Sequence, residues 1–526
     1  MFGQNLGAAV EILPPHQLVR LLTAGVANQE LIDQGRATPQ TLPFLNGSQV
    51  TELRTAADGY YIRYFVSDPS RFHNGAVGGW MMLTVDVLGR PLNTIKDLYA
   101  LPGTPDHFVV VKVPAGTLMR VGIAGPIVGW GPGGGQQILL MEHIGVDDYQ
   151  TVASLPGAVR GGDFASLSNG RNAGSTAAYL DGLPQGDPFA YLQVVRLSLD
   201  YLEGSAFDIA LNQISPERYD ALNRAGLEQG LIFSQTMMNH AALGMSLQGQ
   251  YTVWGGMVGN LARYDTFGEH TGFDLSTGGV MTGIDCLVNS HVRLGFGLGF
   301  LQSDLDFPQD GGEGKSRSMN LGVSGIYRQG PLNLALQVNA AAVNDQIGRT
   351  LVFSGVDRTA SGELDGYRLA VGMEAGWRLK LDHDLAIIPY AGISLIHLFH
   401  RGCTEANAED LDLKVRDFEA NTLVPELGIR VNKEFSIANH LPLILNAGLA
   451  YAPRLPLDDR VIEASLANQG GSFFAFGRDE ALHVFMPSLS LSTTAIGGFD
   501  LQLAYTGNLA DGVNAHSLTA ALSCRF

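Results

Sequence analysis

Two short stretches in the N-terminal half carry side chains that could hold a phosphorylated ligand. Arg63 lies within the aromatic stretch 60–66, and Gln137 follows three consecutive glycines at 133–135. A guanidinium can hold a pyrophosphate through two parallel hydrogen bonds, and glycines let a backbone approach a ligand closely. In the plainer interpretation, the glycines only turn the chain. Arg63 then lies on a solvated strand face, and Gln137 pairs with backbone.

Both stretches belong to residues 58–145, which we predict to form one small α+β module. The sequence indicates a short helix at 93–100 with a capping residue at its start. Strands are expected at 60–66, 78–84, 107–114 and 118–122, and the stretch 131–140 is expected to be a glycine turn that leads into a further strand. These elements would have to position Arg63 and Gln137 around any ligand.

The residues before this module, 1–57, are predicted to be helical. Leu18, Leu21 and Leu22 share one face of a helix over 15–23, and a second helix is expected at 28–36. The first ten residues contain no basic residue, although a secretory signal begins with basic residues. We therefore expect this sequence to be a fragment of a longer chain, or its start codon to be misassigned.

A connector and a helix are expected to lead out of the module. Residues 146–210 are rich in loops and hold one amphipathic helix at 188–202. At the junction 211–245, Ser215 is placed to cap a helix and Pro216 falls in its first turn. That helix can run through 223–239.

The C-terminal half, 246–526, alternates apolar with polar or tiny residues at period two. In the stretch 292–300, for example, Val292, Leu294 and Phe296 alternate with Arg293 and Gly295. Successive side chains of a strand face opposite sides of a sheet, so one face is apolar and the other is polar or small. A membrane barrel with lipid outside would show this pattern, and so would a large soluble β-sandwich.

Length and loop pattern favour the barrel. Many segments run ten to sixteen residues, and a tilted membrane strand needs about nine to eleven. Short connections alternate with long ones near 265–272, 307–315, 353–363, 403–421 and 453–472, as in bacterial barrels. The twelve predicted strands are 249–264, 273–288, 292–306, 316–328, 332–352, 365–381, 385–400, 421–435, 442–453, 473–493, 499–507 and 516–526.

Composition excludes several classes of function. The formal net charge is −18, which argues against nucleic-acid binding. Cys286, Cys403 and Cys524 show no metal-ligand spacing. A bridge between Cys286 and Cys524 is geometrically possible, but unpaired cysteines are favoured. We expect no metal and no cofactor.

The C-terminal half resembles the β-domain of the single-chain autotransporters (type V secretion). The similarity rests on Val-Trp-Gly-Gly at 253–256, on 283–287, on the junction stretch 212–219 and on the end Ser-Cys-Arg-Phe, where Phe526 would be the C-terminal signal. The resemblance implies a monomeric barrel in a bacterial outer membrane, with a helix in its lumen. It also implies assembly by the barrel assembly machinery, and translocation or display of the N-terminal passenger at the cell surface. Some relatives cut themselves near this junction, but the surroundings of Asn239 do not match that type and we predict no autocleavage.

The module at 58–145 resembles the NAD-cleaving toxin domains related to the tuberculosis necrotising toxin, and also a module of several bacterial surface proteins. The resemblance rests on the arginine strand, the Gly-Gly-Trp strand and Gly-Gly-Gly-x-Gln. It implies that Arg63 and Gln137 are catalytic, that Gly133, Gly134 and Gly135 bind NAD, and that NAD is a substrate. No residue here matches the histidine of those toxins, and His107 is interpreted as an ordinary strand residue. The alternative is an adhesive or binding module without chemistry.

Overall fold

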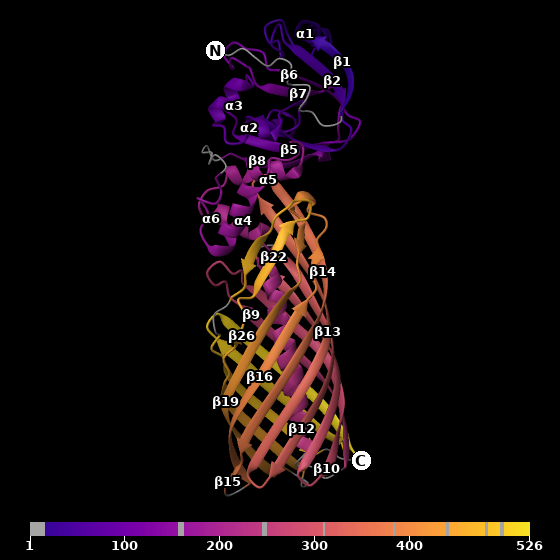
Figure 1. The fold of residues 1–526 in the computed structure, drawn as a ribbon, viewed down its shortest axis with the longest axis vertical. Helices are drawn as coiled ribbons and strands as arrows, with labels where there is room; N and C mark the ends of the chain where they lie inside the picture. The colour runs from indigo at the N-terminus through magenta and orange to yellow at the C-terminus, as the bar shows by residue number, and fades with distance from the viewer. Residues whose placement is uncertain are drawn as a thin grey trace.

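The computed structural model describes residues 16–155, 163–244, 250–308, 311–381, 384–437, 441–478, 482–494 and 499–526. The molecule is elongated, with a long β-barrel at one end and a small N-terminal module stacked on the other (Figure 1). The C-terminus lies at the end of the barrel that is far from the module (Figure 1).

The barrel has twelve antiparallel strands, as predicted from the sequence. The last strand pairs with the first, with Cys524 opposite Val253 and Val513 opposite Tyr264, so the sheet closes on itself. Closure leaves no free strand edge, which lipid could not satisfy with hydrogen bonds. The strands are β9 Tyr251–Tyr264, β10 Phe273–Asn289, β11 Val292–Phe307, β12 Gly312–Gln329, β13 Leu332–Phe353, β14 Val356–Trp377, β16 Leu385–His400, β19 Phe418–Ile437, β20 Leu441–Tyr451, β24 Phe485–Thr494, β25 Phe499–Ala510 and β26 Val513–Arg525.

Two of the expected long loops are strand instead. β13 and β14 continue to a tight turn, with Phe353 paired to Val356, so the loop expected at 353–363 was wrong. β11 and β12 likewise continue to Phe307 and Gly312, where the loop 307–315 was expected. The reason is burial: the extended ends carry side chains such as Leu351 and Val356, which are fully buried beneath the connector helices.

Two true loops fold into a second small sheet above the barrel. The loop between β16 and β19 supplies β17 Cys403–Thr404 and β18 Leu413–Val415, and the loop between β20 and β24 supplies β22 Val461–Leu466 and β23 Phe473–Phe476. The single strand expected at 473–493 is therefore two strands in different sheets. Its first part leaves the barrel because it pairs with β22.

The module is an α+β fold, as predicted, and it contains two sheets. The larger sheet has the order β1-β2-β6-β7-β4 and the smaller one the order β3-β5-β8. Strand bounds are β1 Gln17–Thr23, β2 Gln49–Arg54, β3 Gly59–Phe65, β4 Trp80–Met81, β5 His107–Val113, β6 Leu118–Ile123, β7 Gln136–Leu140 and β8 Tyr149–Ser154. The helices are α1 Ala24–Asp33, α2 Thr84–Val87 and α3 Leu92–Leu98.

The first predicted helix, 15–23, is wrong, because its main part is β1. This strand pairs with β2, which in turn pairs with β6, so the N-terminal residues are built into the module. Leu18 and Leu21 have the spacing of a helix face, yet both are about half exposed at the edge of the sheet. The second predicted helix corresponds to α1, shifted toward the N-terminus.

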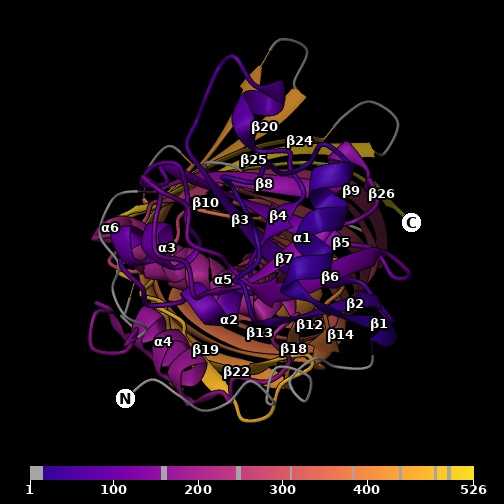
Figure 2. The ribbon, with the colours of Figure 1, turned by 90° about the horizontal axis from the view of Figure 1, so that it is seen from above.

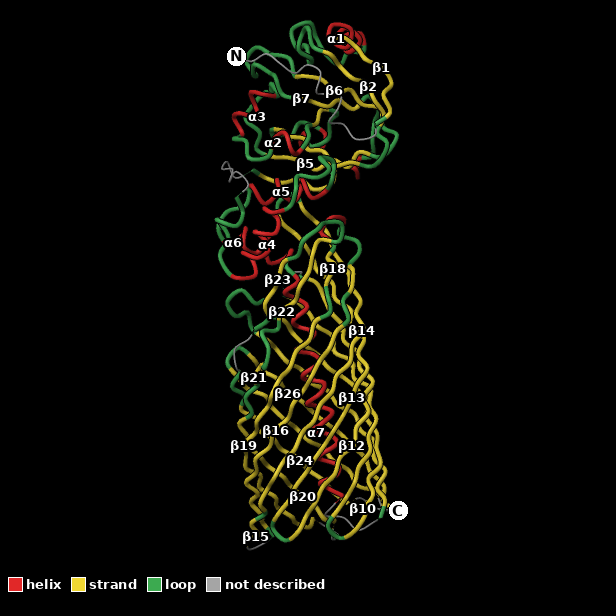
Figure 3. The backbone as a smooth tube through the Cα atoms, in the orientation of Figure 1, coloured by secondary structure: helices red, strands yellow, loops and turns green. Residues whose placement is uncertain are grey.

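Three helices join the module to the barrel, and a fourth enters the barrel. The connector helices are α4 Arg171–Gly182, α5 Tyr191–Asp200 and α6 Ser205–Ile214. The 3-10 helix η4 Pro216–Tyr219 follows, and α7 Asp220–Gly244 runs down the lumen (Figure 3). Seen from above, the module and connector cover the barrel mouth (Figure 2).

Candidate functional site: the lumen helix and the joint with the module

The helix α7 has the length to cross a bilayer inside the barrel. Its 25 residues span about 37 Å at 1.5 Å per residue, and the hydrocarbon core of a bilayer is about 30 Å thick. A Cβ atom at Gly226 would lie 2.5 Å from Leu398 Cδ2 of the barrel wall. The helix therefore fits closely, and the small residue at this position gives it room.

Polar contacts fix the rotation of α7 against the wall. The Gln229 side-chain amide donates to Ser303 Oγ at 2.9 Å and to the Ser316 carbonyl at 3.1 Å. The Asn339 amide donates to Ser234 Oγ, also at 2.9 Å. These inward-facing groups lie on β11, β12 and β13, so the polar face of the strands bonds to the helix rather than to lipid.

An arginine of the wall holds the same helix by its backbone. The fully buried Arg368 on β14 donates from Nη1 to the Gly226 carbonyl at 3.0 Å, and its guanidinium also contacts Asn320. On the other side, Tyr264 of β9 donates to Glu228 at 3.3 Å. The helix is therefore bonded to strands on both sides of the lumen.

Apolar side chains fill the lumen lower down. Phe233 and Met237 of α7 pack with Trp254, Met281 and Leu301 in one buried cluster. His240 stacks on the Trp254 ring, with ring centroids 4.2 Å apart. This cluster lies near the start of β9, toward the end of the barrel that is far from the module.

At the barrel mouth, a buried ion pair holds the chain that enters the lumen. Arg349 and Glu405 are both fully buried and make two hydrogen bonds of 2.7 and 2.6 Å. Arg349 also donates to the carbonyls of Gln213 and Ile214, at the end of α6. Tyr219 donates to Glu405 at 2.8 Å. The ion pair therefore ties β13 and a barrel loop to the connector.

A second contact locks α4 to the small sheet above the barrel. The Asn172 side chain both donates to the Phe476 carbonyl, at 3.2 Å, and accepts from the Phe476 amide, at 2.8 Å. Tyr179 stacks on Phe473, with centroids 4.6 Å apart. Glu269, in the loop after β9, accepts from the backbone amides of Arg171 and Asn172 at the start of α4. The connector therefore contacts these two barrel loops and, through the Leu192 amide of α5, which donates to Asp410 at 2.9 Å, a third.

Arg63 lies between the two sheets of the module. It donates to the Trp80 carbonyl at 3.1 Å and to the Gly75 carbonyl at 3.3 Å. Burial lowers the pKa of this guanidinium below its ordinary value. Its strand neighbours Tyr61 and Phe65 belong to the core between the sheets, and Arg63 lies on the same strand face as they do.

Gln137 lies on the other face of the larger sheet. Its amide donates to the Pro43 carbonyl at 2.6 Å, and the side chain is buried. The next residue on that face, Leu139, packs with the α1 core, whereas Ile138 packs between the sheets. The structure therefore does not bring Gln137 and Arg63 together, and both side chains bind main-chain carbonyls.

The three glycines form the turn before β7. Gly133 and Gly134 have φ angles of 72° and 107°, in the left-handed region that favours glycine. A Cβ atom at Gly133 would lie 2.4 Å from the Ala124 carbonyl oxygen, and one at Gly135 would lie 2.9 Å from the Tyr99 ring. At these positions the turn itself requires glycine.

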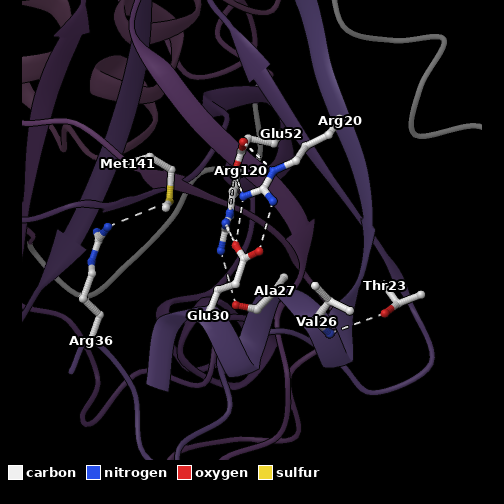
Figure 4. A network of polar contacts seen from close by, with 9 residues as sticks. All are labelled: Arg20, Thr23, Val26, Ala27, Glu30, Arg36, Glu52, Arg120 and Met141. Carbon is white, nitrogen blue, oxygen red and sulfur yellow. Dashed lines mark hydrogen bonds and ion pairs between the residues drawn. The ribbon is translucent and has the colours of Figure 1, made fainter. Parts of the chain in front are cut away.

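A network of four charges joins α1 to the larger sheet (Figure 4). Arg20 donates to Glu30 and to Glu52, and Arg120 contacts the same two carboxylates. Burial raises the pKa of Glu52, but the hydrogen bonds from Arg20 and Arg120 outweigh burial and leave that pKa below its ordinary value. The same balance lowers the pKa of Glu30. Both groups are therefore ionised at neutral pH.

The C-terminal residue, the cysteines and Asn239, which the sequence analysis singled out, can also be located. Phe526 accepts from the Tyr251 amide at 3.3 Å and donates to the Tyr251 carbonyl at 3.0 Å, so it extends the β26–β9 seam. All three cysteines are free. Asn239 is exposed in the lower part of α7.

Within the described ranges, no group of three or more His, Cys, Asp or Glu residues could hold a metal ion. No described helix is long and apolar enough to cross a membrane.

Sequence reasoning did not find the residues that make the joint. Arg349 and Glu405 are 56 positions apart, and each stands alone in a strand or loop. The one available signal was an arginine on the inward-facing row of β13, where a charge needs a partner.

Comparison with known proteins finds a family model that matches most of the barrel. Residues 253–506 match the family model described as "Autotransporter beta-domain". No curated protein matches the chain.

Several solved structures are similar to part of the chain. The translocator domain of autotransporter NalP from Neisseria meningitidis is 14% identical, with a TM-score of 0.45, and the match covers 56% of this chain and 96% of that one. The β-domain of the Bordetella autotransporter Brka is 17% identical, with a TM-score of 0.40, and the match covers 53% and 100%. The transport unit of AIDA-I from Escherichia coli is 11% identical, with a TM-score of 0.35, and the match covers 55% and 99%.

Proposed function

We propose, on the premise that the C-terminal half of the chain is an autotransporter β-domain in the outer membrane, that the barrel anchors the N-terminal module and displays it at the cell surface. The observation that carries this proposal is the path of the chain. The module lies beyond one barrel mouth, and α7 connects it through the lumen to β9. A chain with this path has its module on one side of the membrane and the far end of α7 on the other.

The arrangement of turns supports the outward orientation of the module. At the end away from the module, β10 and β11 are joined at Asn289–Val292, and β12 and β13 at Gln329–Leu332. The loops that form the small sheet lie at the module end. Short periplasmic turns and longer outer loops are the rule for outer-membrane barrels.

We infer further that the module stays attached after export. The connector is bonded to the barrel mouth by the buried pair Arg349–Glu405 and by the reciprocal contact of Asn172 with Phe476. If α7 only filled the lumen, its own contacts with the barrel wall would hold it. The connector would then not need these contacts with the barrel mouth. Display as a fixed extension of the barrel accounts for them. Insertion of the barrel by the barrel assembly machinery belongs to the same proposal.

Labelling of intact cells tests the proposal directly. Val128 is 98% exposed on the module, and His291 lies in a turn at the opposite end of the barrel. In a chain whose three cysteines are changed to serine, we expect Val128→Cys to react with a membrane-impermeant maleimide on intact cells. His291→Cys should react only after the outer membrane is permeabilised. The reverse pattern would refute display.

An NAD-cleaving activity of the module is the alternative from another class. It would use Arg63, Gln137 and the glycines Gly133, Gly134 and Gly135, with NAD as the substrate. The full chain would have to turn over NAD and lose that turnover in Gln137→Ala. A module that binds or adheres without chemistry is the third candidate, and it would show no NAD turnover in either form.

A further inference from the structure

Three polar side chains at the end of the smaller sheet form a continuous hydrogen-bonded chain. His107 and Ser154 are directly opposite each other on β5 and β8. Ser154 Oγ lies 3.2 Å from His107 Nε2, and His107 Nδ1 lies 2.8 Å from Asp106 Oδ1. Hydroxyl, imidazole and carboxylate therefore follow in the order that activates a serine nucleophile.

The carboxylate determines which nitrogen of His107 carries the proton. Burial raises the pKa of Asp106, but hydrogen bonds from His107 and from the Ser67 amide outweigh it and hold that pKa below its ordinary value. An ionised carboxylate can only accept, so Nδ1 donates to it. Nε2 is then an acceptor and can take the proton of the Ser154 hydroxyl.

The imidazole is also held in place from its side. The Phe65 ring stacks on His107, with centroids 5.6 Å apart and an interplanar angle of 25°. The Ser67 amide donates to Asp106 Oδ1 at 2.8 Å, so the chain after β3 is bonded to the same carboxylate. These supports keep the side chains in register although His107 is only partly buried.

A strained loop with an apolar tip rests on the same phenylalanine. His73, Asn74 and Gly75 have φ angles of 46°, 55° and 95°, three left-handed residues in a row. Such backbone is costly for His and Asn, and it concentrates at functional sites. Phe72 at the tip is 66% exposed, and a Cβ atom at Gly75 would be only 3.5 Å from the Phe65 ring. The loop thus offers an apolar surface beside the polar chain.

We propose that Ser154 and His107 form an acyl-transfer site on the module, with Asp106 as a positioning residue, and that the site hydrolyses esters of small apolar acids. Ser154 Oγ forms a bond to the ester carbonyl carbon while its proton passes to His107 Nε2. The bond from that carbon to the leaving oxygen breaks, and His107 returns the proton to the leaving alcohol. Water then attacks the acyl-serine carbon and gives a proton to His107; the bond from that carbon to Ser154 Oγ breaks, His107 returns the proton to Ser154 Oγ, and the acid is released.

Labelling with a fluorophosphonate probe tests the site in the folded full-length chain. Peptide mass spectrometry locates the label, and p-nitrophenyl acetate reports hydrolysis. We expect Ser154 to be labelled at least about 100-fold faster than the exposed Ser166, the lower end of what a positioned general base supplies. Ser154→Ala should remove both labelling and hydrolysis. Ser166→Ala is the matched control and should change neither.

Variants of the base and of its neighbour complete the test. His107→Asn should slow Ser154 labelling about 100-fold or more, whereas His143→Asn, at an exposed histidine of the same module, should not. Asp106→Asn should slow labelling, because an amide nitrogen can donate to Nδ1 and leave the proton on Nε2, which then cannot take the proton of Ser154. Asp106→Glu keeps a carboxylate acceptor and should retain more of the labelling than Asp106→Asn, which a merely structural role for Asp106 would not predict. Labelling of Ser154 no faster than Ser166, or an unchanged rate in His107→Asn, would overturn the proposal.

Discussion

Removing Glu405 should loosen the joint between connector and barrel more than any exposed substitution. In Glu405→Ala the fully buried Arg349 loses both of its carboxylate hydrogen bonds. Tyr219 and the Leu413 amide lose an acceptor as well. Breaking a buried pair by removing one partner costs about 3–5 kcal/mol, since an unpaired charge is left behind.

That cost predicts how far proteolysis of the connector should accelerate. When local opening is fast relative to cleavage, the cleavage rate follows the population of the open form. At about 1.4 kcal/mol per factor of ten, 3–5 kcal/mol raises the rate between about 100- and 4,000-fold. The assay is limited thermolysin cleavage of the full chain in detergent micelles, followed on gels for bands cut within 163–214.

Two controls separate the buried pair from general damage. Asp274→Ala breaks an ion pair with Arg263 whose side chains are 51% and 68% exposed, and exposed pairs contribute at most about 1 kcal/mol. The double variant Arg349→Met, Glu405→Leu leaves no unpaired charge and should recover the part of the protection that the unpaired charge costs. A rise of less than about 5-fold in Glu405→Ala would refute the reasoning.

Acid, the α4 contact and the barrel glycines offer three more tests. Lowering the pH through the depressed pKa values of Glu30 and Glu52 should destabilise the module. The stability from their ion pairs is present above their ordinary pKa of 4.5 and is lost as each carboxylate is protonated; Glu52→Gln should flatten this dependence in a fluorescence titration of Trp80 and Trp130. Asn172→Ala should weaken the docking of α4 by about 1–3 kcal/mol, because the partly buried amide and carbonyl of Phe476 each lose a hydrogen bond; hydrogen exchange of β23 measures it, and exchange equal to wild type would contradict it. Gly283→Val should reduce the yield of folded, heat-modifiable barrel, because even its Cβ would be 2.5 Å from the Phe296 carbonyl oxygen and 2.4 Å from the Trp254 ring, whereas Gly278→Ala, with nothing within 4 Å, should leave the yield unchanged.

Most of the correct sequence predictions came from the period-two alternation of apolar and polar residues in the barrel strands. In β11, Leu294, Phe296 and Leu298 are outward and exposed, while Arg293 and Ser303 face inward and are fully buried. The alternation is a local property of each strand, so it can be read without knowing the partner strands. The helix cap at Ser215 could likewise be predicted from neighbouring residues alone, and the Ser215 side chain does accept from the Glu217 amide at 3.2 Å.

Non-local contacts decided the features that the sequence did not reveal. The stretch that includes Leu18 and Leu21 fits a helix by spacing, but pairing with β2 makes it a strand. β23 leaves the barrel because it pairs with β22 and docks on α4. The partners of Arg349, and the alignment of Ser154 with His107, depend on which strands become neighbours. No spacing within one segment encodes that information.

The measurement that tests the central claim most directly combines surface proteolysis with heat-modifiability. Intact cells are treated with external protease, and their outer membranes are run on a gel with and without boiling. We expect a band that shifts on boiling, as a closed twelve-stranded barrel should, and that loses the N-terminal module only when protease has been added. A band that does not shift, or a module that survives external protease yet is cut after the outer membrane is opened, would contradict it.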